Sequence, residues 1–347
     1  MAMALQSQTV LVTGANGYIG NAVCRAFVQA GWTVYGLVRR SDAFTDLAAE
    51  EIIPVHGSIG DDSFVPALLT QQKTFNVIVS TTENVGNFKS HFKDIVSMLL
   101  AVSESSNASG VRPLVMFTSG CKDYGMTGRD DSEGLAPHTE ASPLDPPSTI
   151  ADRCFTSPKI FQYSHAFDAV LLRPTTVFGR SSSYYGPFFE LAQHAKYTST
   201  PLILPAHPKS IVHGAHVDDC ANAYVSIAEF DRTRIAGQCY NISSNRYETL
   251  DEIAQVLVEE YNLENGVVYE PPLHKPGSQF DIVQILTGFS QWVGSEKLRQ
   301  DVGWKDRRHL FSEGLKAYRL AYEAAVESGH SNVSRVKGYI EAFAIKK

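Results

Sequence analysis

A glycine-rich turn lies near the start of the chain, in the stretch VTGANGYIG between a short apolar run and a helical pattern. Gly14, Gly17 and Gly20 have the spacing GxxGxxG. In such a turn the first glycine permits a tight bend, the second lets the backbone approach a pyrophosphate, and the third lets helix and strand pack closely. The turn therefore predicts a βαβ unit whose first loop holds the phosphates of a dinucleotide.

Alternating strands and helices continue this pattern along the chain. Short apolar segments, each typical of a strand buried on both faces, lie at residues 9–13, 33–38, 51–55, 76–80, 113–118 and 169–173. Segments long enough for helices lie between them, most clearly at 21–30 and 92–105. We expect an α/β fold with a doubly wound parallel sheet of the Rossmann type.

The pattern changes after residue 179, where expected helices are separated by short strands such as PLILP and QCYNIS. This change predicts a smaller, mostly helical C-terminal substrate domain. We expect an NADP-binding domain at residues 1–180 with returning segments at about 211–250, and a substrate-binding domain at 181–210 and 251–347.

Composition excludes several classes of function. The 347 residues carry a formal net charge of -7, which gives no basic field for nucleic acid. The five cysteines lie far apart without a CxxC pair, which argues against a disulfide framework and a metal site. The first residues resemble no signal peptide, and no apolar run reaches the roughly 18 residues of a membrane span. We expect a cytoplasmic protein with a small-molecule ligand.

The end of the second predicted strand indicates which dinucleotide is bound. An NAD site would place an acidic residue there against the ribose hydroxyls, but Arg39 and Arg40 occupy these positions. A guanidinium pair suits a 2′-phosphate, so we expect NADP rather than NAD. The alternative is two solvated arginines that close a strand.

Several motifs together resemble the extended branch of the short-chain dehydrogenase/reductase family, of the NAD-dependent epimerase/dehydratase and dihydroflavonol reductase type. TGANGYIG resembles the family's TGxxGxxG, FTSG with DYG resembles YTSSxxxYG, and LLRPTTVFG resembles LRPxxVYG. HVDDCANAY and YNISS resemble two later family segments, in the same order. The resemblance implies a nicotinamide dinucleotide as cofactor and often a homodimer, built on the helices near 88–107 and from about 148.

The resemblance also implies a set of cofactor-binding residues. They are Gly14, Asn16, Gly17, Tyr18, Ile19 and Gly20 at the pyrophosphate, Arg39 and Arg40 at the 2′-phosphate, Ser58 and Ile59 at the adenine, Thr81 by the ribose, and Arg153 with Pro174, Thr175, Thr176 and Val177 at the nicotinamide end; Thr118 is a further cofactor contact. Ser58 departs from the family, which usually has Asp there, so adenine recognition is expected to be looser.

The catalytic residues depart further from the family pattern. The family uses a Ser or Thr four residues before the Tyr of YG and a Tyr-x-x-x-Lys pair, in which the lysine lowers the pKa of the tyrosine. Here Gly120 occupies the first position, and the chain contains no YxxxK. The tyrosine and lysine positions fall on Thr149 and Arg153. A threonine hydroxyl is too weak an acid, so the usual proton relay is expected to be absent.

Other residues could replace the relay. Candidate catalytic residues are Ser119, Lys122 and Arg153; candidate substrate contacts are Cys121, Tyr184, Tyr185 and His213. Burial would bring the pKa of a lysine into a useful range, whereas a lysine in a loop is more often solvated. Ser119 could instead cap the end of a strand, and Arg153 could form a surface ion pair. The alternative for Cys121, Tyr184 and Tyr185 is packing.

Three functions follow from this pattern. The first is an NADP-dependent oxidoreductase that acts on a small carbonyl or hydroxyl compound with a non-standard acid/base set. The second is a redox-neutral isomerase or epimerase on the same scaffold. The third is a non-catalytic NADP-binding sensor or regulator. We favour an enzyme, because aromatic, histidine and lysine residues surround the expected cleft.

Overall fold

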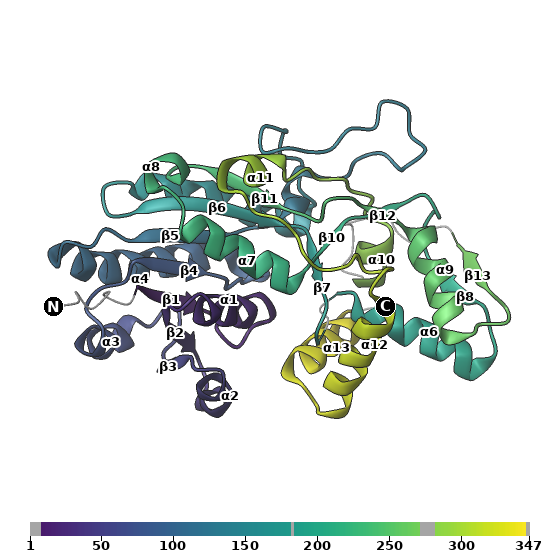
Figure 1. Ribbon diagram of the computed structural model, residues 1–347, viewed down its shortest axis with the longest axis horizontal. Coiled ribbons are helices and arrows are strands. Elements are labelled where there is room, and N and C mark those ends of the chain that lie inside the picture. The colour runs from purple at the N-terminus through teal and green to yellow at the C-terminus, as the bar shows by residue number, and fades with distance from the viewer. Residues whose placement is uncertain (1–7, 182–183, 271–281, 345–347) are drawn as a thin grey trace.

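A computed structural model of the chain describes residues 8–181, 184–270 and 282–344. Figure 1 shows a sheet covered by helices on both faces, with a smaller and mostly helical part beyond one end of the strands. The expected fold class is confirmed.

The main sheet has seven parallel strands in the order β11-β6-β5-β4-β1-β2-β3. Its strands are β1 (Thr9–Thr13), β2 (Thr33–Val38), β3 (Ile53–His56), β4 (Val77–Ser80), β5 (Leu114–Thr118), β6 (Asp168–Pro174) and β11 (Cys239–Ile242). Six of them lie where the apolar segments predicted strands. The seventh, β11, comes from QCYNIS, which returns to pair with β6.

Alternate residues of each strand face two separate cores, because successive side chains point to opposite faces of a sheet. Val10 and Val12 pack under the helices α1 (Tyr18–Gln29) and α7 (Val217–Ala228). Leu11 packs on the other face under α3 (Val65–Gln71) and α4 (Phe88–Ala108). The other helices of this half are α2 (Phe44–Ala49), α5 (Ala151–Thr156) and α8 (Arg232–Ile235).

The apolar stripe of α4 belongs to the core of the monomer. Five of its members, Phe92, Ile95, Val96, Leu99 and Val102, are buried against the sheet. The width of this stripe, which motivated the homodimer, is therefore explained by core packing. The homodimer stays a prediction; Phe155 on α5 is an exposed apolar residue, with 56% of its surface accessible.

The helical part contains α6 (Gly186–Thr198), α9 (Leu250–Tyr261), α10 (Ile282–Thr287), α11 (Glu296–Val302), α12 (Leu315–Glu327) and α13 (Ser331–Ala344). Three short strand pairs accompany these helices: β7 (Thr176–Phe178) with β10 (Gly214–His216), β8 (Leu202–Leu204) with β13 (Val267–Tyr269), and β9 (Ile211–Val212) with β12 (Glu248–Thr249). A capping box between Thr249 and Glu252 fixes the start of α9. The core of this part is rich in aromatic side chains.

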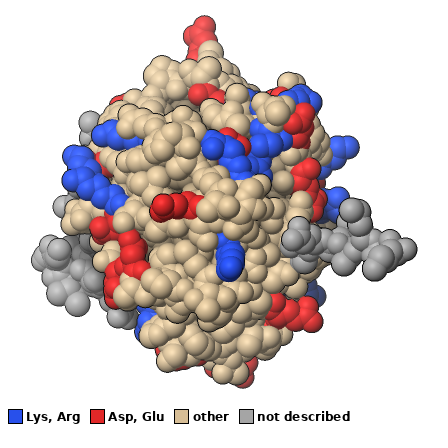
Figure 2. All heavy atoms as spheres, turned by 90° about the vertical axis from the view of Figure 1, so that its left-hand side faces the viewer, with Lys and Arg blue, Asp and Glu red and all other residues tan. Residues whose placement is uncertain are grey.

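Charged side chains and helix lengths were compared with the expectations from composition. Figure 2 shows basic and acidic side chains interspersed on one face, without a continuous area of either sign. Of the helices that the structure describes, none combines the length and apolar character that a membrane span requires.

Candidate active site

The glycine turn forms a tight cradle between β1 and α1. Gly14 has a φ of +67°, which favours glycine, and its carbonyl accepts a hydrogen bond from the Gly17 amide at 2.7 Å. A Cβ at Gly17 would lie 2.9 Å from the Gly14 oxygen, and one at Gly20 would overlap it. The absence of side chains is therefore what allows the loop to close and places the first turn of α1, where a phosphate can meet helix amides, directly after it.

Two hydroxyl groups tie this cradle to neighbouring segments. Thr81, directly after β4, donates its hydroxyl hydrogen bond to the Thr13 carbonyl at 2.6 Å. Tyr18 donates to the Gly179 carbonyl at 2.6 Å and so joins the first turn of α1 to the end of LLRPTTVFG. Asn16 and Ile19 stand partly exposed on the loop. The cofactor residues implied by the resemblance thus gather at the carboxyl ends of β1 and β4.

The two arginines after β2 are both exposed, but they differ in their partners. Arg40 forms an exposed ion pair with Asp42 at 3.3 Å. Within the part of the chain that the structure describes, Arg39 has no ion pair. The pKa of His91 is lowered mainly by the burial of its own ring, and the positive charge of Arg39 lowers it further. Ser58 is half-buried and donates to the Ile59 carbonyl at 3.3 Å. The guanidinium of Arg39 is free to meet a ligand.

In a second group of predicted site residues, Gly120 and Arg153, which occupy the family's serine and lysine positions, lie next to each other. A Cβ on Gly120 would lie 3.2 Å from Nη2 of Arg153. The structure therefore brings together the serine and lysine positions that the sequence assigned. Thr149, at the tyrosine position, lies exposed in the turn before α5.

The Arg153 guanidinium is held between two carboxylates. Nη1 donates to Glu83 at 3.1 Å, and Nη2 donates to Asp123 at 2.8 Å. Burial opposes the charge, but the two carboxylates outweigh it and raise the pKa of Arg153 above its ordinary value. Nε is buried and has no hydrogen-bond partner among the described residues. Arg153 can therefore offer a donor and a permanent charge to a ligand, but no transferable proton.

Asp123 is a central residue that the sequence analysis missed. Its fully buried carboxylate accepts hydrogen bonds from Ser119 at 2.6 Å, from Arg153, and from Nε of Arg173 at 3.3 Å. Arg173 also donates to the Tyr124 hydroxyl at 3.1 Å. The signal in the sequence is an acidic residue directly before YG, at a position that the family pattern leaves open. The Ser119 hydroxyl is thus committed to Asp123.

Lys122 lies in the turn η4 (Cys121–Tyr124), where the helical part of the molecule meets the sheet. Its Nζ is 4.0 Å from the ring centre of Phe289, and Gln291 fastens the turn by donating to the carbonyls of Cys121 at 2.8 Å and Gly125 at 2.6 Å. No carboxylate of the described residues pairs with this amine. Burial, with Arg153 adding to it, lowers the pKa of Lys122 to about 7.

Two residues proposed as substrate contacts are buried in packed surroundings. The Cys121 thiol donates to the Arg173 carbonyl at 2.8 Å, and burial raises its pKa, so it packs and is no nucleophile. Tyr185 is fully buried among Phe178, Phe188 and Phe311, which is the packing alternative that the sequence left open.

His213, another predicted substrate contact, is buried and its ring joins two backbone segments by hydrogen bonds. Nδ1 accepts from the Val293 amide at 3.2 Å, so Nε2 carries the hydrogen that it donates to the Ser244 carbonyl at 3.1 Å. Burial lowers its pKa to about 4, and the ring stays neutral. Tyr184 is partly exposed beside residues outside the described part of the chain.

The remaining nicotinamide-end residues lie on β5, β6 and β7. Thr118 shares a hydrogen bond with the Tyr224 hydroxyl at 2.8 Å, and the hydroxyl of Thr175 donates to the Ile242 carbonyl at 3.2 Å. Pro174 and Val177 are buried, and Thr176 is partly exposed.

Comparison with known proteins agrees with this geometry. Serine 3-dehydrogenase from Agrobacterium fabrum is 37% identical over 84 residues, which are 23% of this chain and 34% of that protein. The match thus spans about a third of that relative. UDP-glucuronic acid 4-epimerase from Bacillus cereus, in complex with NAD, has a TM-score of 0.68 at 16% identity over 91% of this chain and 99% of its own.

A second solved structure, dTDP-glucose 4,6-dehydratase from Bacillus anthracis in complex with NAD, has a TM-score of 0.69 at 17% identity, covering 92% of this chain and 98% of its own. These two structural likenesses show the fold alone. The sequence pattern carries more: residues 10–243 match the NAD dependent epimerase/dehydratase family. The chain belongs to this family of nicotinamide-dependent enzymes.

Proposed function

We propose that the chain is an NADP-dependent oxidoreductase that acts on a small carbonyl or hydroxyl compound and uses Lys122 in place of the missing tyrosine. The observation that carries this proposal is the position of the Lys122 amine. It lies over Phe289 without a carboxylate partner among the described residues, close enough to Arg153 for the guanidinium to lower its pKa.

The residues present fit a nicotinamide dinucleotide. A Cβ at Gly17 or Gly20 would crowd the Gly14 carbonyl, so the glycines permit the tight turn at the start of α1 that a pyrophosphate site requires. The orphaned Nε of Arg153 offers a donor at the nicotinamide end. Arg39 is available for a 2′-phosphate, which supports NADP over NAD. When bound, the nicotinamide supplies or accepts a hydride.

Lys122 would then move the proton that accompanies the hydride. In reduction its ammonium donates a proton to the substrate oxygen; in oxidation its neutral amine takes the proton of the hydroxyl. Both forms are populated near neutral pH because the pKa of Lys122 is about 7. Arg153 stays protonated throughout and orients ligand oxygens.

The test begins with a screen of aldehydes, ketones and enones for NADPH consumption. With an active substrate, Lys122→Met should lower kcat by about a hundredfold to ten-thousandfold, the usual contribution of a positioned acid or base. The NADPH affinity should stay unchanged. Lys89→Met, which removes an exposed lysine paired with Asp152, is the matched control and should keep full activity.

Stability separates a catalytic loss from an unfolded variant. The pKa of Lys122 is about 7 in the folded chain and ordinarily 10.5. The unfolded chain therefore binds more protons between these values, and the protonated lysine lowers stability at neutral pH. Lys122→Met should unfold at an equal or higher urea concentration than the wild type. Full turnover in this variant would refute the proposed role.

A further inference from the structure

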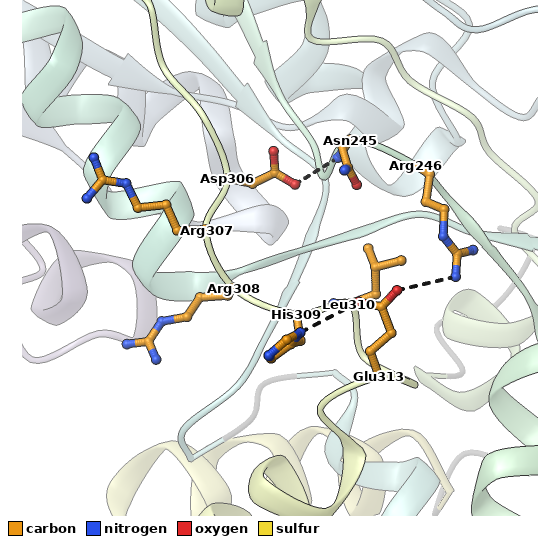
Figure 3. A pocket seen from close by; sticks show the side chains of 8 residues that line it. All are labelled: Asn245, Arg246, Asp306, Arg307, Arg308, His309, Leu310 and Glu313. Carbon is orange, nitrogen blue, oxygen red and sulfur yellow. Dashed lines mark hydrogen bonds and ion pairs between the residues drawn. The ribbon is translucent and has the colours of Figure 1, made fainter.

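Charged side chains join segments of the chain in the pocket of Figure 3, which has a volume of about 190 Å³. Asp306 accepts a hydrogen bond from the Asn245 amide at 2.9 Å, and Nη2 of Arg246 lies 3.7 Å from the Glu313 carboxylate. The acids of this pocket are therefore occupied by contacts within the chain. A buried contact of another kind, made by an uncharged side chain, joins the segment 288–295 to the turn that carries the proposed proton carrier.

The side chain of Gln291 spans this turn. Gln291 is 6% exposed and lies in the segment 288–295, which connects α10 to α11. Its Nε2 donates to the carbonyl of Cys121 at 2.8 Å and to that of Gly125 at 2.6 Å. The first carbonyl directly precedes Lys122, and the second follows η4. An amide nitrogen carries two hydrogens, so one side chain supplies a donor to both carbonyls and closes the turn.

The backbone around Gln291 is itself held on two sides. Its amide donates to the Ile211 carbonyl of β9 at 3.2 Å, and the Ser290 hydroxyl accepts from the Ile211 amide at 2.9 Å. The Trp292 amide donates to the Thr127 hydroxyl at 3.0 Å. A side chain that starts from a backbone held in this way can hold another group in place.

The two central side chains of the turn have different surroundings. Asp123 binds the Arg153 guanidinium at 2.8 Å and is fully buried. The amine of Lys122 instead lies 4.0 Å from the ring centre of Phe289, which is 5% exposed and precedes Gln291 by two residues. The same segment therefore supplies the amide that closes the turn and the ring that the amine contacts.

We propose that Gln291 is a positioning residue for Lys122, whose amine it keeps over Phe289 by holding the turn closed. This role depends on the proposed function, in which Lys122 carries the proton. Without the Gln291 amide, water or the ammonium itself would have to satisfy the two carbonyls, and both favour the charged form of the lysine. Among the described residues, Arg153 and the Cys121 thiol are the other titratable groups that act on the amine.

Gln291→Met tests the proposal, because methionine keeps the length of the side chain and has no donor. In chains labelled with ¹³C at the lysine ε position, the titration midpoint of Lys122 should rise by about one pH unit or more. The kcat of NADPH-dependent reduction should fall about tenfold to a hundredfold, as expected for a displaced catalytic group, while the KM for NADPH stays constant.

Gln255→Met is the matched control. It removes an exposed glutamine that donates to Asp251 at 3.0 Å on α9. Its Lys122 midpoint and its kcat should equal those of the wild type. Urea denaturation verifies that both variants are folded. A purely structural role of Gln291 would lower the urea midpoint without moving the titration of Lys122.

A measurement on the wild-type chain keeps the proposal testable if Gln291→Met does not fold. With ¹⁵N in the glutamine side chains and signals assigned through the backbone, the Gln291 amide should shift with pH at the midpoint of Lys122, whatever that midpoint is. The reason is that the carbonyl that accepts from Gln291 directly precedes Lys122. In Lys122→Met this shift should disappear.

Two results would overturn the positioning role. One is an unchanged Lys122 midpoint in folded Gln291→Met, and the other is a Gln291 amide signal that does not follow Lys122. Full turnover in Lys122→Met is a separate outcome: it refutes the proposed function, whereas the coupling between Gln291 and Lys122 is measured without any turnover.

Discussion

The two groups of predicted site residues, at the glycine turn and around Asp123, are built in different ways. The phosphate cradle depends on what is missing, because Gly14, Gly17 and Gly20 leave space and expose backbone amides. The second group depends on charged side chains, with Asp123 and Arg153 buried against each other. Backbone geometry of the first kind is specified locally by a few residues. An ionic network of the second kind is specified by distant segments, so its chemistry can change while the cradle stays the same.

The largest expected effect concerns the ionic end. Asp123→Asn would leave Arg153 and Arg173 without the carboxylate that both contact. Breaking a buried ion pair on one side costs about 3–5 kcal/mol of folding stability. Urea denaturation measures this loss. Asp152→Asn, which removes an exposed partner of Lys89, should cost at most about 1 kcal/mol. Equal free energies of unfolding for the two variants would show that the ionic network at Asp123 contributes little to folding stability.

A smaller effect is expected at the cradle end. Arg39→Gln removes the free guanidinium assigned to the 2′-phosphate, so NADP binding should weaken about tenfold to a hundredfold while NAD binding stays constant. Calorimetric titration of both dinucleotides gives the ratio. Arg129→Gln, which removes an exposed arginine paired with Asp131, serves as the control. A wild-type chain that binds NAD as tightly as NADP would contradict the assignment.

The smallest effect is expected at the former tyrosine position. Thr149 is exposed and cannot act as the acid, so Thr149→Val should keep turnover within about threefold, less than 1 kcal/mol in the barrier. Steady-state kinetics with the substrate found by the NADPH screen measures it. Loss of turnover with unchanged cofactor affinity would show that Thr149 takes part in the chemistry.

The sequence predicted the strand–turn–helix fold at the glycine turn because its signals are local. Glycine spacing, strand and helix periods, and the arginines after β2 all lie within 40 residues of the start. The family resemblance also assigned Gly120 and Arg153 to the serine and lysine positions, and the structure brings these two residues together.

The ionic end could be predicted only in part. Asp123 and Glu83 approach Arg153 from different elements, and no local period reports such contacts. Tyr185 and His213 were predicted to contact substrate because aromatic and histidine residues occur both in protein cores and in binding sites. The residue type alone does not distinguish these two locations. Their burial depends on tertiary packing that short motifs do not encode.

Titration of Lys122 tests the central claim most directly. In a chain labelled with ¹³C at the lysine ε position, NMR spectra across pH 5 to 11 follow each amine, and Lys122→Met identifies the signal of Lys122. We expect a midpoint near pH 7, because burial and the nearby Arg153 disfavour the ammonium form. A midpoint near the ordinary 10.5 would contradict the account, since Lys122 would then be a solvated charge and no neutral-pH proton carrier.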